Sequence, residues 1–257
     1  MDNINSIPVL GSVPYLRKFS NLRDTNKSII KDLDSIPLEK YLYLYDVLLS
    51  VNKVYPIRSL AITSAESQDG KSLTSILLAK AFSSFGQRVL LIDADITKKH
   101  IHSRLGIENK FGLCEILKNK ESSIHKGIHT INKNLKVITS GHKYKNAPDL
   151  LFSKENLNIF NQKLFELKDI DLIIYDFSPV KSIDSYSNNF HSLRAFELVV
   201  IVDALLMLVN KNYSTERMYY HSIKKLLKKN IFILGLIINS RIHKKYQSLA
   251  SAYERTQ

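Results

Sequence analysis

The stretch RSLAITSAESQDGKS, residues 58–72, predicts a buried strand that leads into a phosphate-binding loop and then into a helix. Its apolar run, residues 60–62, is short and gives way to a polar loop, as at the end of a strand. The amphipathic segment 73–85 then predicts a helix that ends at Gly86. Because strand, loop and helix in this order are typical of a Walker A motif, the rest of the chain can be interpreted from this stretch.

The end of the loop carries the groups that bind the phosphates of a nucleotide. A Walker A loop needs inward backbone N–H groups, a lysine that reaches the terminal phosphates and a hydroxyl that holds Mg²⁺. Gly70, Lys71 and Ser72 supply these parts, whereas Ala65 stands where the first glycine of such a loop usually lies. The following helix adds unpaired N–H groups and a partial positive charge at its N-terminus. The predicted nucleotide-binding residues are therefore Ala65, Glu66, Ser67, Gln68, Asp69, Gly70, Lys71, Ser72 and Leu73.

The Gly-Lys-Ser triplet alone is a weak signal, and two acidic motifs further along the chain strengthen it. Val89–Ile92 is an apolar run followed by Asp93 and Asp95, and residues 172–175 form another that ends in Asp176. Open α/β sheets bind ligands at the carboxyl ends of their strands. Carboxylates beside a phosphate loop can hold Mg²⁺ and water, or act as a base. We therefore predict one site that contains the three aspartates and the phosphate loop.

The remaining pattern predicts an α/β fold with a mostly parallel twisted sheet and helices on both faces. Nearly all-apolar strands alternate with amphipathic helices, as in parallel sheets that are buried on both sides. The further predicted elements are helices at 38–52, 111–119, within 148–168 and at 214–229, and strands at 135–141, 204–209 and 231–238. The predicted division is an N-terminal arm and linker at 1–36, a nucleotide-binding domain at 37–241 and a C-terminal tail at 242–257.

Composition limits the class of protein and its partners. The chain has 257 residues, of which 44% are hydrophobic, enough for a sizeable core in one α/β domain or two small ones. Its 37 basic and 24 acidic residues give a net charge of +13, which favours a nucleotide, a nucleic acid or an anionic membrane surface as partner. The single cysteine, Cys114, excludes an internal disulfide and fits a reducing compartment. No Cys/His spacing suggests zinc, and we interpret His100 and His102 as surface residues.

No stretch of the sequence has the pattern of a membrane span or a signal peptide. The longest apolar run, residues 198–209, is too short to span and contains Asp203. At the N-terminus, Asp2 stands in place of a basic region and Pro8 and Pro14 interrupt any apolar helix. We therefore expect a soluble, cytoplasmic chain.

Three motifs in order, residues 65–72, 89–95 and 172–179, resemble those of the bacterial tyrosine autokinase family, the cytoplasmic kinase modules of capsule and exopolysaccharide export systems. The likeness covers most of the chain. PVLGSVP, residues 8–14, resembles the segment that links a chain-length-determinant membrane region to the kinase domain in this family. The family has a P-loop NTPase fold akin to that of chromosome-partitioning ATPases, and the acidic motifs alone do not separate the two. The stretches GLCEIL and NAPDLL favour the kinase.

The resemblance implies ATP and Mg²⁺ as ligands and a role for each motif residue. Lys71 would bind the β- and γ-phosphates, and Ser72 and Asp176 would hold Mg²⁺. Asp93 or Asp95 would orient the metal and accept the proton of a tyrosine hydroxyl. The catalytic candidates are thus Lys71, Asp93 and Asp95, and the metal-binding candidates are Ser72, Asp93 and Asp176.

The resemblance extends to the end of the chain. Asn239, in the stretch IINSR, resembles an asparagine that contacts the base in related nucleotide-binding proteins. Kinases of this family present a tyrosine-rich C-terminal tail to a neighbouring subunit in a ring. The tail of this chain holds Tyr246 and Tyr253, which are the candidate phosphoacceptors.

Two departures from the family concern activity and assembly. Thr97 stands where the family usually has an arginine after the second Walker motif. In the segment 38–52, Glu39 remains from the family's Glu-x-x-Arg-x-x-Arg pattern, but Leu42 and Tyr45 replace both arginines, which serve ring assembly. We therefore expect a monomer or a loose homo-oligomer and reduced activity.

Three hypotheses for function follow. The first is a Mg-ATP-dependent protein-tyrosine autokinase that controls polysaccharide polymerisation and export, with a membrane chain-length-determinant protein and the anionic inner face of the membrane as partners. The second is an ATP-binding regulatory partner that has lost phosphoryl transfer. The third, a partitioning-type ATPase, is weaker because no lysine lies between Arg58 and Lys71, where such ATPases usually carry a second one. We expect no nucleic-acid partner.

Overall fold

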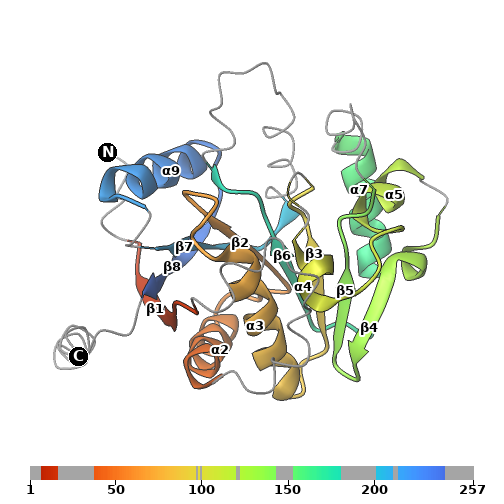
Figure 1. The fold of residues 1–257 in the computed structure, drawn as a ribbon, viewed down its shortest axis with the longest axis horizontal. Helices are drawn as coiled ribbons and strands as arrows, with labels where there is room; N and C mark the ends of the chain where they lie inside the picture. Colours follow the sequence, from red (N-terminus) through yellow and green to blue (C-terminus); the bar gives the residue numbers. More distant parts are fainter. Residues whose placement is uncertain are drawn as a thin grey trace.

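The computed structural model describes residues 7–16, 38–96, 98, 100–119, 122–142, 153–180, 201–210 and 214–240. They form an eight-stranded sheet in the order β1-β8-β7-β2-β6-β3-β5-β4, with helices on both faces (Figure 1). The strands are β1 Val9–Pro14, β2 Ser59–Ser64, β3 Val89–Asp93, β4 Ile128–Asn132, β5 Leu135–Ile138, β6 Leu172–Asp176, β7 Ala204–Val209 and β8 Ile233–Ser240. The helices are α2 Glu39–Asn52, α3 Lys71–Ser84, α4 Ile101–Leu105, α5 Leu113–Lys118, the 3₁₀-helix η3 Ile124–Gly127, α7 Lys154–Phe165 and α9 Glu216–Lys228.

The sheet is parallel throughout except for the hairpin β4–β5, so the predicted α/β fold with a mostly parallel sheet is confirmed. Because the parallel strands all run one way, their ends lie together. We call the edge that follows Ser64, Asp93 and Asp176 the carboxyl edge, and the edge that precedes Ser59 and Leu172 the amino edge. Loops distant in sequence meet at each of these edges.

The helices form two layers that bury the sheet. Apolar side chains of α2, α3 and α4 pack on one face, and those of α5, α7 and α9 pack on the other. The side chains of β3, β6 and β7 are buried along their whole length. A strand covered on both faces needs apolar residues at successive positions, which is why these strands read as continuous apolar runs.

The helix α2 lies over α3 and is part of the core (Figure 1). It buries Tyr41, Leu44, Tyr45 and Leu48, whereas Leu49 is exposed. Because α2 covers α3, the predicted amphipathic helix α3 is buried on nearly all sides.

The structure corrects the sequence analysis at the N-terminus. Residues 9–14 do not lie apart as an arm: β1 pairs in parallel with β8, from Val9 opposite Leu236 to Pro14 opposite Ser240. The sheet therefore begins before residue 37, the predicted start of the nucleotide-binding domain. Strand β4 and helix α4 were also missed, because both are short and lack a clear period.

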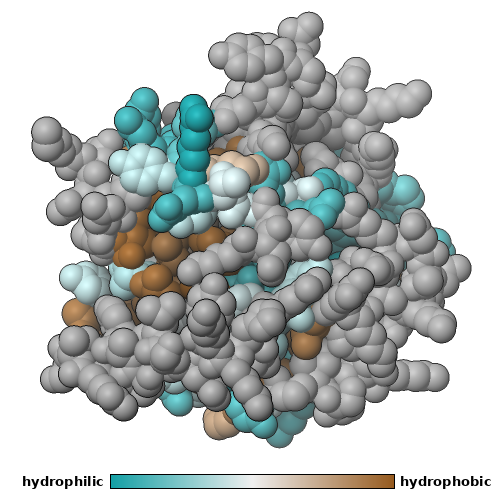
Figure 2. Space-filling view, turned by 60° about the vertical axis from the view of Figure 1, so that its left-hand side comes forward, coloured by the Kyte–Doolittle hydropathy of each residue, from teal (hydrophilic) through white to brown (hydrophobic). Residues whose placement is uncertain are grey.

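Apolar residues gather below a group of hydrophilic ones on the side of the molecule that carries α9, β8 and β1 (Figure 2).

Gly112, which precedes α5, offers a test of how this layer is packed. The amide of Leu113 donates to the carbonyl oxygen of Thr139 at 2.7 Å, so the backbones of α5 and the end of β5 lie against each other. A Cβ at position 112 would lie 2.2 Å from that same oxygen. We expect Gly112→Ala to lower the free energy of unfolding by about 1 to 3 kcal/mol, measured by urea denaturation.

Gly127→Ala is the matched control. Its Cβ would lie 2.7 Å from Cδ1 of Ile116, the far end of a flexible side chain, which can move. The control should therefore lose less stability than Gly112→Ala, and equal losses would contradict the close backbone approach.

Candidate nucleotide-binding site

The loop between β2 and α3, residues 65–70, lies at the carboxyl edge. It ends at a position whose backbone conformation requires glycine. Gly70 has φ of 95°, in the left-handed region, and immediately precedes α3. A Cβ there would lie 2.5 Å from Nδ2 of Asn239. The close approach brings the last residues of β8 against the loop.

Asp69 holds the shape of this loop from inside. Its side chain is fully buried, the amide of Glu66 donates to its Oδ2 at 2.9 Å, and the Ser214 hydroxyl donates to its Oδ1 at 2.7 Å. Burial raises the pKa of Asp69, while the hydrogen bonds from Glu66 and Ser214 act in the opposite direction. Nδ2 of Asn239 donates to the backbone oxygen of Asp69 at 2.7 Å. The loop is therefore tied both to β8 and to the start of α9.

The three predicted aspartates are buried at the carboxyl edge. Asp93 at the end of β3 and Asp176 at the end of β6 are register partners on neighbouring strands. On the other side of β6, Asp176 pairs with Ile62 of β2, the strand that leads into the loop. The parallel register therefore places carboxylates from two strands directly beside the phosphate loop.

The first turn of α3 faces Asp176. The Ser75 hydroxyl lies 3.2 Å from Oδ1 of Asp176 and 3.0 Å from the backbone oxygen of Lys71. Lys71 is only 4% exposed. Burial raises the pKa of Asp176 to about 6, although the Lys71 charge and the hydroxyls of Ser72 and Ser75 lower it. The lysine and the serine hydroxyls thus stabilise the charged form of this carboxylate, against the effect of burial.

Asp93 and Asp95 accept hydrogen bonds from the segments that follow β3 and β6. The amide of Ile101 donates to Oδ2 of Asp93 at 3.3 Å, and Oδ1 of Asp95 accepts from the Ser178 hydroxyl at 2.8 Å and from the amide of Lys98 at 3.2 Å. Burial raises the pKa of Asp93 well above its usual range, and the neighbouring Asp176 and Asp95 raise it further.

The oxygen atoms at this edge fit a hard divalent cation. Oδ1 of Asp93 and Oδ2 of Asp176 are buried and accept no hydrogen bond from the residues that the structure describes. Within those residues, no group of three or more His, Cys, Asp or Glu side chains could hold a metal ion by itself. Mg²⁺ is usually held by one or two carboxylates together with substrate phosphates and waters. The donor set therefore suits Mg²⁺ that arrives with a nucleotide.

The structure brings together most of the predicted site residues. The nine loop residues from Ala65 to Leu73 and the three aspartates lie at the carboxyl edge, and Asn239 lies against Gly70. Oδ1 of Asn239 accepts no hydrogen bond from the described residues. Tyr246, Tyr253 and Thr97 lie outside the described residues.

His100 and His102 are only partly exposed, whereas the sequence analysis interpreted them as surface residues. His100 lies near Asp95 and Lys71 of the site. Burial and the nearby Arg104 lower the pKa of His100 to about 4, while Asp95 acts in the opposite direction.

Three serines of the site were missed by sequence reasoning. Ser75 lies three residues after Ser72 on the same helical face, a spacing that could have indicated it. Ser178 follows the second acidic motif by two residues and could have been suspected from that position. Ser214 is 145 residues from Asp69, and no local pattern connects the two.

Burial of Asp176 predicts that the free energy of unfolding depends on pH. Its pKa in the folded protein is about 6, whereas an aspartate in an unfolded chain titrates near 3.9. A raised folded pKa means that the stabilising contribution of the protonated form is complete below about pH 4 and is lost as the pH rises to about 6. Asp176→Asn should therefore stabilise the nucleotide-free protein by up to about 3 kcal/mol at pH 7 to 8 and have little effect near pH 4.

The measurement is urea denaturation across this pH range without Mg²⁺ or nucleotide. Asp46→Asn, which changes an exposed carboxylate of α2, is the control and should leave the pH profile unchanged. A loss of stability in Asp176→Asn at pH 7 would contradict the assignment of a destabilising buried charge.

In sequence, the chain is similar to tyrosine-protein kinases of bacteria. The chain is 36% identical over 128 residues to the tyrosine-protein kinase YwqD of Bacillus subtilis and 30% identical over 145 residues to the putative tyrosine-protein kinase CapB of Staphylococcus aureus. These matches cover 49% and 56% of this chain and 52% and 62% of the two relatives, so less than two thirds of either relative is matched. The resemblance to bacterial tyrosine kinases predicted from the motifs is confirmed.

Solved structures show the same fold. The kinase domain of the Escherichia coli tyrosine kinase ETK superimposes with a TM-score of 0.77 at 24% identity, covering 92% of this chain and 91% of that one. Cobyrinic acid a,c-diamide synthase from Mycobacterium smegmatis, with bound ATP analogue and magnesium, superimposes with a TM-score of 0.52 at 16% identity, covering 71% of this chain and 72% of that one. The AAA domain family matches residues 57–233, a segment that contains the phosphate loop, all three aspartates and Ser214. Since that match spans more than half of the chain, this protein belongs to the AAA domain family.

Proposed function

We propose that this protein binds Mg-ATP at the carboxyl edge and transfers the γ-phosphoryl group to tyrosine. The observation that carries the proposal is the burial of Lys71 and Ser72 beside Asp176 and its register partner Asp93. Four groups of this kind, one cationic and three oxygen donors, suit a phosphate and the cation that accompanies it. The similarity to tyrosine-protein kinases gives the class of acceptor.

Each residue has a role that its position allows. Lys71 and the N-terminus of α3 would bind and neutralise the terminal phosphates, and Ser72 and Asp176 would hold Mg²⁺, with Asp93 able to assist. When bound, Mg²⁺ supplies further neutralisation of phosphate charge. Asn239, whose position at the loop is set by Asp69 and Gly70, would lie close to the base.

The transfer itself asks mainly for positioning and charge compensation. The tyrosine oxygen forms a bond to the γ-phosphorus, the bond from that phosphorus to the β–γ bridging oxygen breaks, and ADP leaves. Asp93 or Asp95 would accept the hydroxyl proton. Burial and neighbouring carboxylates raise the pKa of Asp93, which makes this carboxylate a stronger base than an exposed one.

We place this activity in polysaccharide export, at the inner face of the cell membrane and in contact with a membrane chain-length-determinant protein. The support is the resemblance to the tyrosine kinases of such systems and the basic charge of +13. In the part of the chain that the structure describes, every helix is too short or too polar to cross a bilayer.

The second candidate function is an ATP-binding regulatory partner without transfer, and the packing of α2 is the observation that bears on it. Tyr45, which replaces one assembly arginine of the family, is buried with its ring centroid 5.1 Å from that of Phe82. Leu42 is partly buried. These side chains belong to the core of the protein, so charge-assisted hydrogen bonds to another subunit, worth roughly 1.5 to 3 kcal/mol each, are lost at these positions. The proposed oligomer is loose, and trans-phosphorylation of Tyr246 or Tyr253 is slow.

Lys71→Met tests the nucleotide site that both candidate functions share. We expect it to abolish ATP binding in calorimetry and to abolish phosphotyrosine formation, detected by mass spectrometry after incubation with Mg-ATP, because it removes the cation that faces the phosphates. Lys80→Met, in the same helix but away from the first turn, is the control and should leave both unchanged.

Unchanged ATP affinity in Lys71→Met would overturn the site. ATP binding by the wild type with no phosphotyrosine, even when a chain-length-determinant partner is added, would assign the protein to the regulatory class. A stable ring with dense tail phosphorylation would contradict loose assembly.

A further inference from the structure

Large apolar side chains are exposed along the amino edge, at the opposite end of the sheet from the nucleotide site. They come from four separate loops and helix ends. They are 51% to 70% exposed and comprise Val54, Tyr55, Phe85, Phe165 and Phe232. Exposed apolar residues scattered singly need no explanation, but a set gathered at one edge indicates a contact surface.

The topology places these residues in one row. They precede β8, β2, β6 and β3, whose order in the sheet is β8-β7-β2-β6-β3, so their loops lie side by side along the amino edge. Two contacts show this directly. The ring of Tyr55 lies 6.4 Å from that of Phe232, and the guanidinium of Arg58 lies 5.3 Å from the centre of the Phe165 ring.

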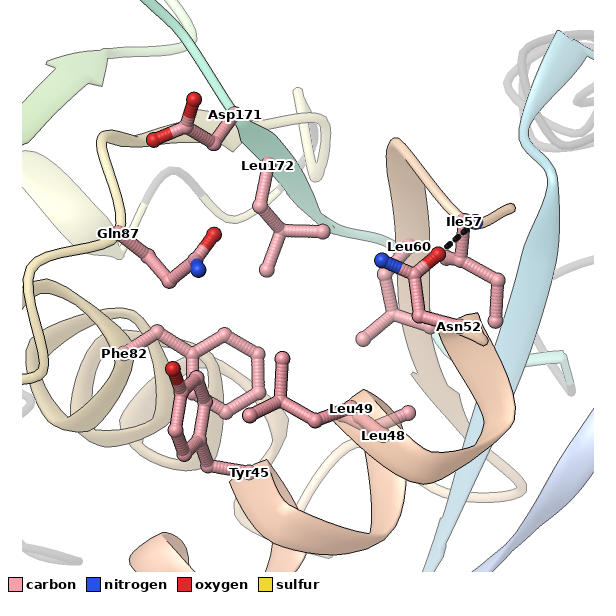
Figure 3. A pocket seen from close by; sticks show the side chains of 10 residues that line it. All are labelled: Tyr45, Leu48, Leu49, Asn52, Ile57, Leu60, Phe82, Gln87, Asp171 and Leu172. Carbon is pink, nitrogen blue, oxygen red and sulfur yellow. Dashed lines mark hydrogen bonds between the residues drawn. The ribbon is translucent and has the colours of Figure 1, made fainter. Parts of the chain in front are cut away.

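An apolar hollow opens at the same edge, between the ends of α2 and α3 (Figure 3). Its walls include Leu48, Leu60 and Phe82, with Asn52 and Gln87 among its polar lining residues. The exposed Phe85 lies beside it, with its ring 5.4 Å from that of Tyr45. The apolar surface therefore continues from the exposed row into the molecule.

The loops that carry these apolar residues also carry exposed basic ones, namely Lys53, Lys168 and Lys229. Most acidic residues near them are engaged within the protein: Asp171 pairs with Arg88, Asp169 pairs with Lys136, and Asp203 accepts from the backbone amides of Arg58 and Ser59. Glu166, next to Phe165, is exposed, so the lysines outnumber the exposed carboxylates rather than stand alone. The amino edge therefore presents aromatic side chains and positive charge together.

We propose that the amino edge docks on an anionic lipid bilayer, the inner membrane face proposed above. Aromatic side chains insert at the boundary between headgroups and acyl chains, and lysines near them are attracted to anionic lipids. A row of separate loops can lie on a flat surface. In this orientation the carboxyl edge, with the nucleotide site, faces away from the bilayer and stays open to ATP and to an acceptor tyrosine.

The test is co-sedimentation of the whole 257-residue chain with vesicles of phosphatidylglycerol and phosphatidylethanolamine, compared with vesicles of phosphatidylcholine alone. The wild type should bind the anionic vesicles and bind the neutral ones weakly. Tyr55→Ser/Phe232→Ser should lower binding about tenfold or more, because two inserting rings are lost. Lys53→Gln/Lys229→Gln should lower it by about fivefold per lysine.

Matched variants on other faces serve as controls. Tyr43→Ser removes an equally exposed ring from α2, beside β1, and Lys40→Gln/Lys110→Gln removes two exposed lysines away from the amino edge. These variants should bind vesicles within about twofold of the wild type. All variants should keep the ATP affinity of the wild type, so failure here is distinguishable from failure of the proposed kinase function.

Three outcomes would overturn the proposal. The first is a wild-type chain that does not sediment with anionic vesicles. The second is equal binding to neutral vesicles. The third is Tyr55→Ser/Phe232→Ser binding as well as the wild type, which would reduce the effect to general attraction by the chain's positive charge.

Discussion

Burial of charge at the carboxyl edge is the constraint on which the rest of the structure depends. Asp93, Asp95 and Asp176 are almost completely removed from solvent, and Lys71 is the buried cation beside them. Burying a carboxylate is costly unless opposite charge or hydrogen bonds compensate it. Serine hydroxyls and backbone amides compensate in part, yet the pKa values of Asp93 and Asp176 remain raised. The carboxylates of the site are therefore only partly compensated by the surrounding protein.

A parallel sheet separates two kinds of surface. At the carboxyl edge, β3 and β6 end in buried aspartates, and the phosphate loop is held by Asp69 and Asn239. At the amino edge, the loops between helices and strands carry exposed aromatic and basic residues. Because the strands lie between the edges, substitutions at one edge leave the groups at the other in place. This separation would let one domain combine the proposed phosphoryl transfer with the proposed attachment.

The α2 helix supports the phosphate loop through α3, and Tyr45 is part of that packing. Its buried face covers α3, the helix whose first turn carries Lys71 and Ser72. Tyr45 is packed between α2 and the end of α3, with its ring near those of Phe82 and Phe85. Aromatic burial at this position stabilises the support of the phosphate loop. The same burial makes the position unsuited to an ion pair with another subunit.

The sequence by itself determined the elements whose signals are local. The stretch before Lys71 predicted a strand, a loop and a helix, and the apolar runs before Asp93 and Asp176 predicted buried parallel strands with carboxylates at one edge, because an all-apolar run needs cover on both faces. Tertiary structure alone decided the contacts between distant segments: β1 beside β8, the Ser214 hydroxyl on Asp69, and the Tyr55 ring beside Phe232. Periodicity describes one element at a time, whereas these contacts depend on strand order, which brings together residues that no local pattern relates.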